Sequence, residues 1–285
     1  MAEPYSALRV FSLTAIAMVA FAANSVLGRL GLVEGGIGAG SFAAIRLMSG
    51  ALLLCLIAGL RTSWGAGTWS GAVSLLVYAA FFSYAYLELG AGTGALILFA
   101  VVQITMVGSG LASGERLSAL QWIGLIMAVA GLIWLLSPGL SAPPLAGAVT
   151  MSIAGVGWGV YSLLGRTAGT DPTRRTAGNF ARASGLGLVL LPAALVGMGE
   201  PSPAAYGILL AILSGAVTSG LGYAIWYAAL PGLSAASAGI AQLTVPAIAA
   251  LGGIVFLGEA MTARFLFSSL VILGGVGLAT RVKRR

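Results

Sequence analysis

Residues 88–115 read ELGAGTGALILFAVVQITMVGSGLASGE, and residues 232–259 read GLSAASAGIAQLTVPAIAALGGIVFLGE; the two stretches align without a gap at a constant offset of 144. Seven positions are identical, including both residues of the closing Gly-Glu pair. A second match joins FAANSVLGR at 21–29 to WGVYSLLGR at 158–166. Such self-similarity indicates a duplicated chain, and duplication in a hydrophobic protein is typical of transporters.

The composition indicates that lipid surrounds the chain. Hydrophobic residues make up 59% of the 285 residues, charged residues make up 7%, and the mean hydropathy is +1.03. A soluble protein of this composition would lack the polar surface to cover itself. Glycine pairs four residues apart also predict closely packed membrane helices. Three such pairs are Gly31/Gly35, Gly90/Gly94 and Gly155/Gly159.

Apolar segments of about 20 residues, the length that crosses a bilayer, recur along the whole chain. The ten predicted spans are 8–28, 40–60, 69–88, 93–113, 117–136, 145–165, 177–197, 206–229, 235–257 and 261–280. Residues 1–139 and 140–285 then hold five spans each. Because five is odd, the two halves insert with opposite topology. This predicts an all-α polytopic membrane protein, with two inverted five-helix repeats around a central cavity.

The distribution of basic residues predicts how the chain lies in the membrane. Lys and Arg are retained on the cytoplasmic side, and the chain ends in Arg281-Val-Lys283-Arg284-Arg285. With an even number of spans, both termini are expected in the cytoplasm, in a multi-pass protein of the inner (plasma) membrane. Contact with this bilayer accounts for the net charge of +7, so no nucleic-acid partner is expected.

Several classes of chemistry lack the residues that they need. Cys55 is the only cysteine and there is no histidine, which excludes an intramolecular disulfide, a Ser-His-Asp triad and an imidazole metal site. The seven acidic residues fall at or near the ends of apolar segments, so no carboxylate pair is placed for acid-base catalysis. We therefore expect a protein that is not an enzyme and that binds no cofactor and no metal.

Two related motifs carry a resemblance to a known family. Tyr86-x-x-x-Gly90-Ala-x-x-Gly-Ala leads into an apolar helix and Gly114-Glu115-Arg116-Leu117, and the second half repeats this as Leu230-Pro-Gly-Leu-Ser-Ala-Ala-Ser-Ala with Gly258-Glu259. Here the chain resembles the EamA domain of the drug/metabolite transporter superfamily, nearest to its aromatic amino-acid exporters. The resemblance implies ten helices in two inverted repeats, a central cavity, and export of amino acids, metabolites or cationic drugs. It also implies a mid-helix proline, which makes Pro246 a candidate hinge, although Val102 replaces it in the first half.

Polar and aromatic side chains at mid-span depth are the candidates for lining the cavity, because they gain nothing from facing lipid. Some follow helical stripes, such as Tyr78 and Phe82, and others are repeat mates, such as Phe21 and Trp158. Aromatic residues also form interfacial belts and a buried Gln can bridge two helices, so a structural role stays open for each. The predicted substrate-binding residues are Asn24, Tyr78, Phe82, Phe99, Gln103, Trp158, Tyr161, Ser162, Tyr223, Trp226 and Gln242.

A cavity built from these residues would offer aromatic faces, amides and hydroxyls, without a fixed charge near its centre. Arg46 and Arg182 lie inside spans but near their ends, where snorkelling or pairing explains them; contact of Arg46 with a substrate carboxylate is the alternative. The cavity chemistry favours amino acids with aromatic or large apolar side chains, or flat cationic drugs. We expect a secondary transporter that exports such small molecules by alternating access, with a channel-like pore or an intramembrane enzyme as alternatives. The oligomeric state is left open, and a monomer is compatible with the sequence.

Overall fold

The computed structural model describes residues 7–59, 65–114, 116–139, 142–166, 171–192, 197, 199–233, 238 and 241–279, without the side chains of 166 and 190–192. Glu115 and the basic tail 281–285, which enter the sequence predictions, lie outside the described residues. All regular structure in the described part of the chain is helical.

Ten helical segments run through the described residues, and each coincides with one predicted span. The largest differences from the predicted bounds are that α1 ends later, at Val33, that α8 begins earlier, at Pro172, and that α12 begins later, at Thr244. The segments are α1 (Ala7–Val33), α2 (Ala39–Ala58), α4 (Trp69–Ala85), α5 (Ala91–Ala112), α6 (Ala119–Leu136), α7 (Leu145–Arg166), α8 (Pro172–Pro192), the continuous run of α9 (Ala205–Ile212), the π-helix η2 (Leu213–Leu221), α10 (Gly222–Ala229) and the 3-10 turn η3 (Leu230–Gly232), then α12 (Thr244–Leu257) and α13 (Ala263–Ala279).

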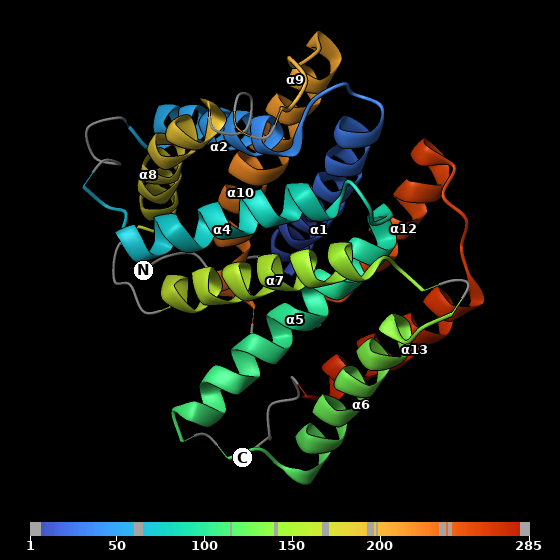
Figure 1. The fold of residues 1–285 in the computed structure, drawn as a ribbon. Coiled ribbons are helices and arrows are strands. Elements are labelled where there is room, and N and C mark those ends of the chain that lie inside the picture. The colour runs from blue at the N-terminus through green and yellow to red at the C-terminus, as the bar shows by residue number, and fades with distance from the viewer. Residues whose placement is uncertain are drawn as a thin grey trace.

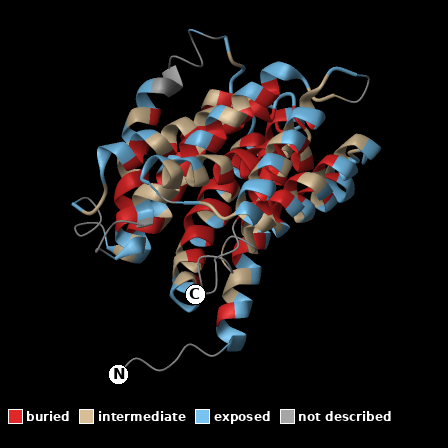
Figure 2. Ribbon diagram, turned by 90° about the horizontal axis from the view of Figure 1, so that it is seen from below, coloured by how far each residue is buried: buried red, intermediate tan, exposed pale blue. Residues whose placement is uncertain are grey.

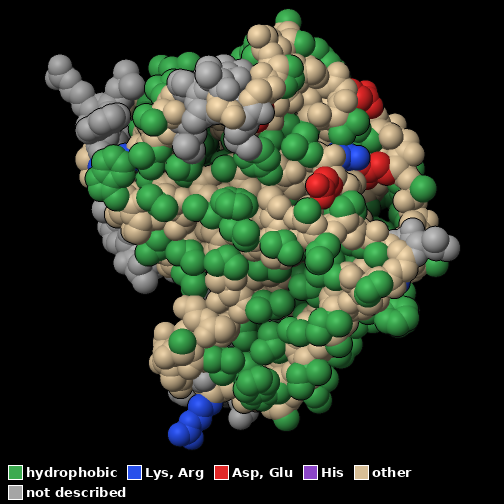
Figure 3. All heavy atoms as spheres, in the orientation of Figure 1, with side chains coloured by type: hydrophobic (Ala, Val, Ile, Leu, Met, Phe, Trp, Pro, Cys, Tyr) green, Lys and Arg blue, Asp and Glu red, His purple; other side chains and the backbone are tan. Residues whose placement is uncertain are grey.

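The outer surface of the bundle is apolar. Six helical segments in the described part are long and apolar enough to cross a membrane. Buried residues gather in the interior (Figure 2), while large hydrophobic side chains such as Leu52, Val189 and Leu270 are exposed on the outside. Hydrophobic side chains spread over the face seen in Figure 3. Such a surface suits lipid and not water, so the chain is a multi-pass membrane protein.

Helices of the first half pack against helices of the second half in a regular scheme. Helix α2 packs on α8, α5 on α12 and α6 on α13, and the two members of each pair hold the same place in the order of helices in their halves. Helix α4 lies along α7, just as α1 lies along α10 (Figure 1). A two-fold exchange of the halves would produce this scheme. The inverted relation of the halves stays a prediction.

Glycines permit the close helix contacts that their spacing predicts. A Cβ on Gly31 would lie 2.6 Å from the ring of Phe42, and one on Gly155 would lie 2.8 Å from Val101. The tightest approach is at Gly215 in η2, where a Cβ would overlap the backbone oxygen of Arg46. Helices α2 and η2 therefore meet backbone to backbone at the level of Arg46.

Replacing Gly215 by Ala is expected to destabilise the protein by about 1–3 kcal/mol, because the added methyl group has no room beside the Arg46 carbonyl. The matched control is Gly274→Ala in α13, where nothing lies within 4 Å of the added Cβ and Ala favours the helix. Thermal unfolding in detergent should show a lowered midpoint for Gly215→Ala alone. Unchanged midpoints for both variants would contradict the close approach.

Candidate functional site

A cavity of about 550 Å³ lies between the two halves toward one end of the bundle. Its walls come from the C-terminal parts of α5 and α7, the beginnings of α6 and α8, and the α10–η3 segment. The volume falls in the range of small-molecule sites. Six of the predicted residues line it: Gln103, Trp158, Ser162, Tyr223, Trp226 and Gln242.

Trp158 lies at the inner limit of this cavity and is packed between other rings. Its ring centroid is 4.9 Å from that of Tyr78, 4.9 Å from that of Tyr223, and 5.4 Å from that of Tyr161 in a stacked arrangement. Tyr161 lies behind Trp158 and is not among the residues that line the cavity. Its ring stacks on the Trp158 ring and supports it from behind.

A second, much smaller void of about 10 Å³ lies beyond Trp158 and Tyr223, which touch both spaces. It is about the size of one water molecule. Four further predicted residues line it: Asn24, Tyr78, Phe82 and Phe99. The fold thus brings all the predicted residues except Tyr161 onto two neighbouring spaces, with Trp158 and Tyr223 between them.

The structure places a fixed charge, that of Arg46, at the centre of the bundle, where the sequence predicts none. The residue does not reach the interface, since only 1% of it is exposed. Its Nη2 donates to the Tyr78 hydroxyl at 2.9 Å and its Nε donates to the Ser219 hydroxyl at 3.1 Å. Its Cζ also lies 4.5 Å from the ring centroid of Phe82. The side chain stays inside because it starts on the face of α2 that packs against η2.

Asn24 extends this polar cluster. Its Oδ1 accepts from Ser214 Oγ at 2.7 Å and from Thr218 Oγ1 at 3.2 Å, and its Nδ2 donates to the Tyr78 hydroxyl at 3.3 Å. Ser214 and Thr218 belong to η2, and π-helical turns are frequent at functional sites. The predicted set includes none of Ser214, Ser219 or Arg46. The polar run 214–220 in mid-span, SGAVTSG, is the sequence signal that points to the two serines.

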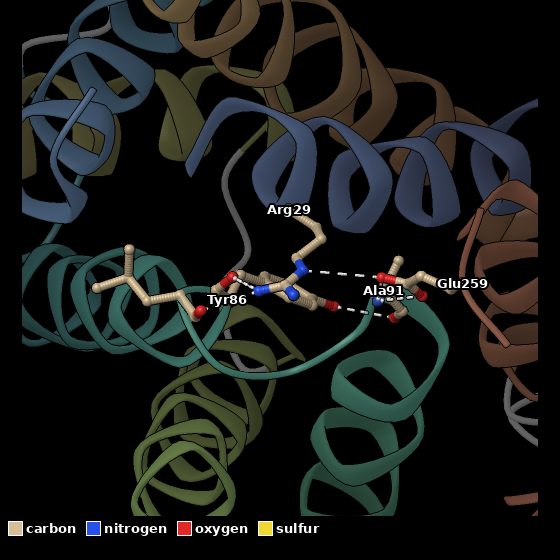
Figure 4. Close-up of polar contacts among 5 residues, drawn as sticks. Arg29, Tyr86, Ala91 and Glu259 are labelled. Carbon is tan, nitrogen blue, oxygen red and sulfur yellow. Dashed lines mark hydrogen bonds and ion pairs between the residues drawn. The ribbon is translucent and has the colours of Figure 1, made fainter. Parts of the chain in front are cut away.

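The opposite end of the bundle is closed by contacts between the halves. Arg29 Nη1 donates to the carbonyl oxygens of Tyr86 at 2.8 Å and Leu87 at 2.9 Å, and Arg29 Nε lies 3.7 Å from Glu259 Oε1 (Figure 4). Glu259 in turn accepts from the Ala91 amide at 2.9 Å. We call Arg29, Tyr86, Ala91 and Glu259 the end clamp, because they join α1, the start of α5 and the segment after α12.

Carboxylates from each half bind helix N-termini of the other half at this same end. Glu259 binds the first amide of α5, Glu200 accepts from the amide of Gly40 at 2.8 Å in α2, and Glu88 accepts from the amide of Gly147 at 2.8 Å in α7. A carboxylate there accepts hydrogen bonds from amides that have no partner within the helix, and its negative charge interacts favourably with the positive end of the helix dipole. These acidic residues therefore have a structural role. No group of three residues suited to a metal occurs in the described part of the chain.

Pro246 lies in the first turn of α12, directly after the turn at Leu243 that separates α12 from the helical residues Ala241 and Gln242. A proline there loses no intrahelical bond of its own. The missing amide would otherwise bond to the carbonyl four residues earlier, that of Gln242, and the chain turns at Leu243. Helix α5 runs without a break through Val102. The two halves therefore differ beside the cavity, and a hinge at Pro246 stays a proposal.

Comparison with known proteins identifies the class of this chain. Residues 145–281 match the model of the EamA-like transporter family. The uncharacterized protein PA1977 of Pseudomonas aeruginosa is 49% identical over 273 residues, which are 95% of this chain and 94% of that protein. The chain belongs to the EamA-like transporter family. An EamA-like protein is a transporter and not an enzyme.

Relatives with a named substrate are more distant from this EamA-like chain. The threonine/homoserine exporter RhtA is 31% identical in Salmonella typhimurium and 30% identical in Escherichia coli K12, each over 173 residues. The match covers 58% of this chain and 56% of the exporter, so the chain spans little more than half of that relative's length. A crystal structure at 20% identity covers 94% of this chain and 97% of its own with a TM-score of 0.63. That likeness shows the shared fold alone.

The end clamp leads to a prediction about opening at its end. Glu259→Gln and Arg29→Gln should each speed the labelling of a cysteine placed at Thr93, which lines a cleft with Glu259, in a Cys55→Ser background. Loss of a partly exposed ion pair worth about 0.2–1 kcal/mol corresponds to labelling that is about 1.4- to fivefold faster. The rates would be measured with a water-soluble maleimide.

Arg264→Gln is the matched control for this labelling. Arg264 is an arginine of the same end, where its Nη1 donates to the carbonyl of Ser137, but it is outside the end clamp. We expect no change in labelling with this variant. Equal effects of Arg264→Gln and Arg29→Gln would mean that the end clamp does not control access.

Proposed function

We propose that this EamA-like protein is a secondary transporter that exports amino acids with aromatic or large apolar side chains by alternating access. The composition of the 550 Å³ cavity carries the proposal: Trp158, Tyr223 and Trp226 offer ring faces, while Gln103 and Gln242 offer donors and acceptors. Ring faces bind aromatic and apolar groups, and a few amides fix the orientation of the bound molecule.

The contrast between the two ends supports alternating access. The cavity lies at one end, and the end clamp closes the other. The pairing of helices supports two inverted repeats, 1–139 and 140–285, that exchange the open and closed roles. Arg116, Arg174 and Arg175 lie at the cavity end, beside its lining residues Leu117 and Pro172. By the positive-inside rule we infer that the cavity faces the cytoplasm and that both termini lie there.

Export of small hydroxylated amino acids is the second candidate. The identity of 31% to the threonine/homoserine exporter favours it, and the hydroxyl and amide groups around Asn24 would suit a substrate hydroxyl. A flat organic cation is disfavoured, because the charge of Arg46 repels it and Arg46 already lies over the rings of Tyr78 and Phe82. A channel-like pore is disfavoured by the end clamp.

Counterflow in proteoliposomes tests the proposal. Purified protein would be reconstituted with unlabelled amino acid inside, and the uptake of labelled phenylalanine, leucine, threonine and homoserine would be followed. Faster exchange of phenylalanine and leucine supports the proposal, and faster exchange of threonine and homoserine supports the second candidate. Flux that does not saturate indicates a pore, while no flux of any of the four contradicts amino-acid export.

Replacing Trp158 by Ala should weaken the transport of aromatic amino acids more than that of small aliphatic ones. The variant loses the ring at the inner limit of the cavity, and an aromatic pair is worth about 1 kcal/mol, or roughly several-fold in apparent affinity. Trp134→Ala is the matched control, since Trp134 is 53% exposed on the outer surface. A parallel loss for all substrates with a lowered thermal midpoint would make Trp158 a structural residue.

Reporter fusions test the inferred orientation. A reporter joined after Gly139, between the two halves, should give an external signal, and one joined after Arg285 should give a cytoplasmic signal, because the basic residues hold their loops inside. Paired alkaline phosphatase and fluorescent-protein fusions would measure this. A reversed pattern would place the cavity on the external side, and equal signals at both sites would contradict the number of spans.

A further inference from the structure

Arg46 is a buried cation without an acidic partner among the described residues. Two ion pairs occur there, and neither includes Arg46. Its Nε and Nη2 donate to the hydroxyls of Ser219 and Tyr78, which are neutral groups. Its Nη1 is buried and donates to no partner in the described part of the chain. These contacts leave Nη1 without an acceptor and the charge of this side chain without a carboxylate among the described residues.

An unmatched guanidinium in an apolar bundle is unfavourable. Burial of a charge costs a lot of free energy unless an opposite charge accompanies it, and Arg cannot lose its proton to avoid that cost. Hydroxyl groups satisfy hydrogen bonds but do not neutralise the charge. A carboxylate would supply both, since its two oxygens match the planar fork of donors. An anionic group that arrives with a ligand therefore completes this site.

Tyr78 connects Arg46 to the two spaces of the candidate site. Its ring centroid lies 4.9 Å from Arg46 Cζ and 4.9 Å from the Trp158 ring centroid, and its hydroxyl accepts from Arg46. Tyr78 lines the small void, and Trp158 and Tyr223 separate that void from the large cavity. A ligand in the large cavity would reach Tyr78 and Arg46 if these two rings moved apart.

We propose that Arg46 and Tyr78 bind the carboxylate of the transported molecule, while its aromatic or apolar part occupies the 550 Å³ cavity. This inference rests on the proposed function and states which group of the substrate is recognised. The recognised class is an organic acid with an apolar body. Selection is by charge: a molecule of the same shape with an amide in place of the acid leaves the guanidinium unmatched.

Two probes of nearly equal shape test the inference, 3-phenylpropanoate and 3-phenylpropanamide. Binding of each to the purified full chain in detergent would be measured by isothermal titration. The wild type is expected to bind the acid roughly ten- to a hundredfold more tightly, as for a hydrogen bond to a charged group. Arg46→Gln should abolish this preference, because it weakens the binding of the acid and not that of the amide. Tyr78→Phe should reduce the preference without abolishing it.

Arg182→Gln is the matched control, because it removes the same charge from the neighbouring helix α8, where Arg182 lies over the ring of Trp69. It should keep the preference for the acid. If Arg46→Gln does not fold, Arg46→Lys keeps the charge without the fork, and it should retain a smaller preference. The inference is overturned if the wild type binds neither probe or binds both equally well. It is also overturned if Arg46→Gln or Tyr78→Phe keeps the full preference for the acid.

The counterflow assay separates this inference from the proposed function. Acid preference that depends on Arg46, without amino-acid counterflow, would leave the carboxylate site standing and reject amino acids as the substrates. Amino-acid counterflow with equal binding of the acid and the amide would leave the function standing and reject Arg46 as the carboxylate ligand.

Discussion

The guanidinium of Arg46 constrains the centre of the molecule, because its donors need oxygen atoms at fixed positions inside an apolar bundle. Tyr78 supplies one from α4 and Ser219 supplies another from η2. Packing between apolar helices in lipid has little directional preference. Hydrogen bonds to one arginine therefore set the register of three helices. The absence of a side chain at Gly215 lets η2 come close enough to take part.

A different constraint acts at the closed end. Three helices start there, and their first amides have no acceptor within the helix. Glu88, Glu200 and Glu259 each satisfy such amides across the boundary between the halves. Movement of one half against the other would break these contacts together. Under the proposed alternating access, the closed end would therefore open as a unit, and these carboxylates would stabilise the closed conformation of this end over the open one.

Features that depend on local pattern were predictable from the sequence, and features that depend on a distant partner were not. Span length and turn residues set the ten helical segments, so these agree with the prediction apart from one end each of α1, α8 and α12. The burial of Arg46 depends on Ser219, which is 173 residues away in the chain, and a hydropathy pattern does not register such a pair. The hydroxyls of η2 likewise bond to Asn24 from 190 and 194 positions away. The turn before α12 falls at Leu243, next to Gln242, whose carbonyl Pro246 cannot bond. The sequence motif predicts the proline but not the position of this turn.

Beside the π-helix η2, the residue that matches Tyr78 in the sequence repeat is not the one that takes its place in the structure. At the offset of 144, the residue that matches Tyr78 is Gly222, yet it is Tyr223 whose ring lies 4.9 Å from Trp158, the same distance as Tyr78. A π turn holds more residues than an α turn, so each residue rotates less about the helix axis. The equivalent ring therefore comes one residue later. A duplicated gene product with strict two-fold symmetry would present matching walls to its cargo. This shift makes the two walls unequal, so a molecule held between them meets different groups on its two sides.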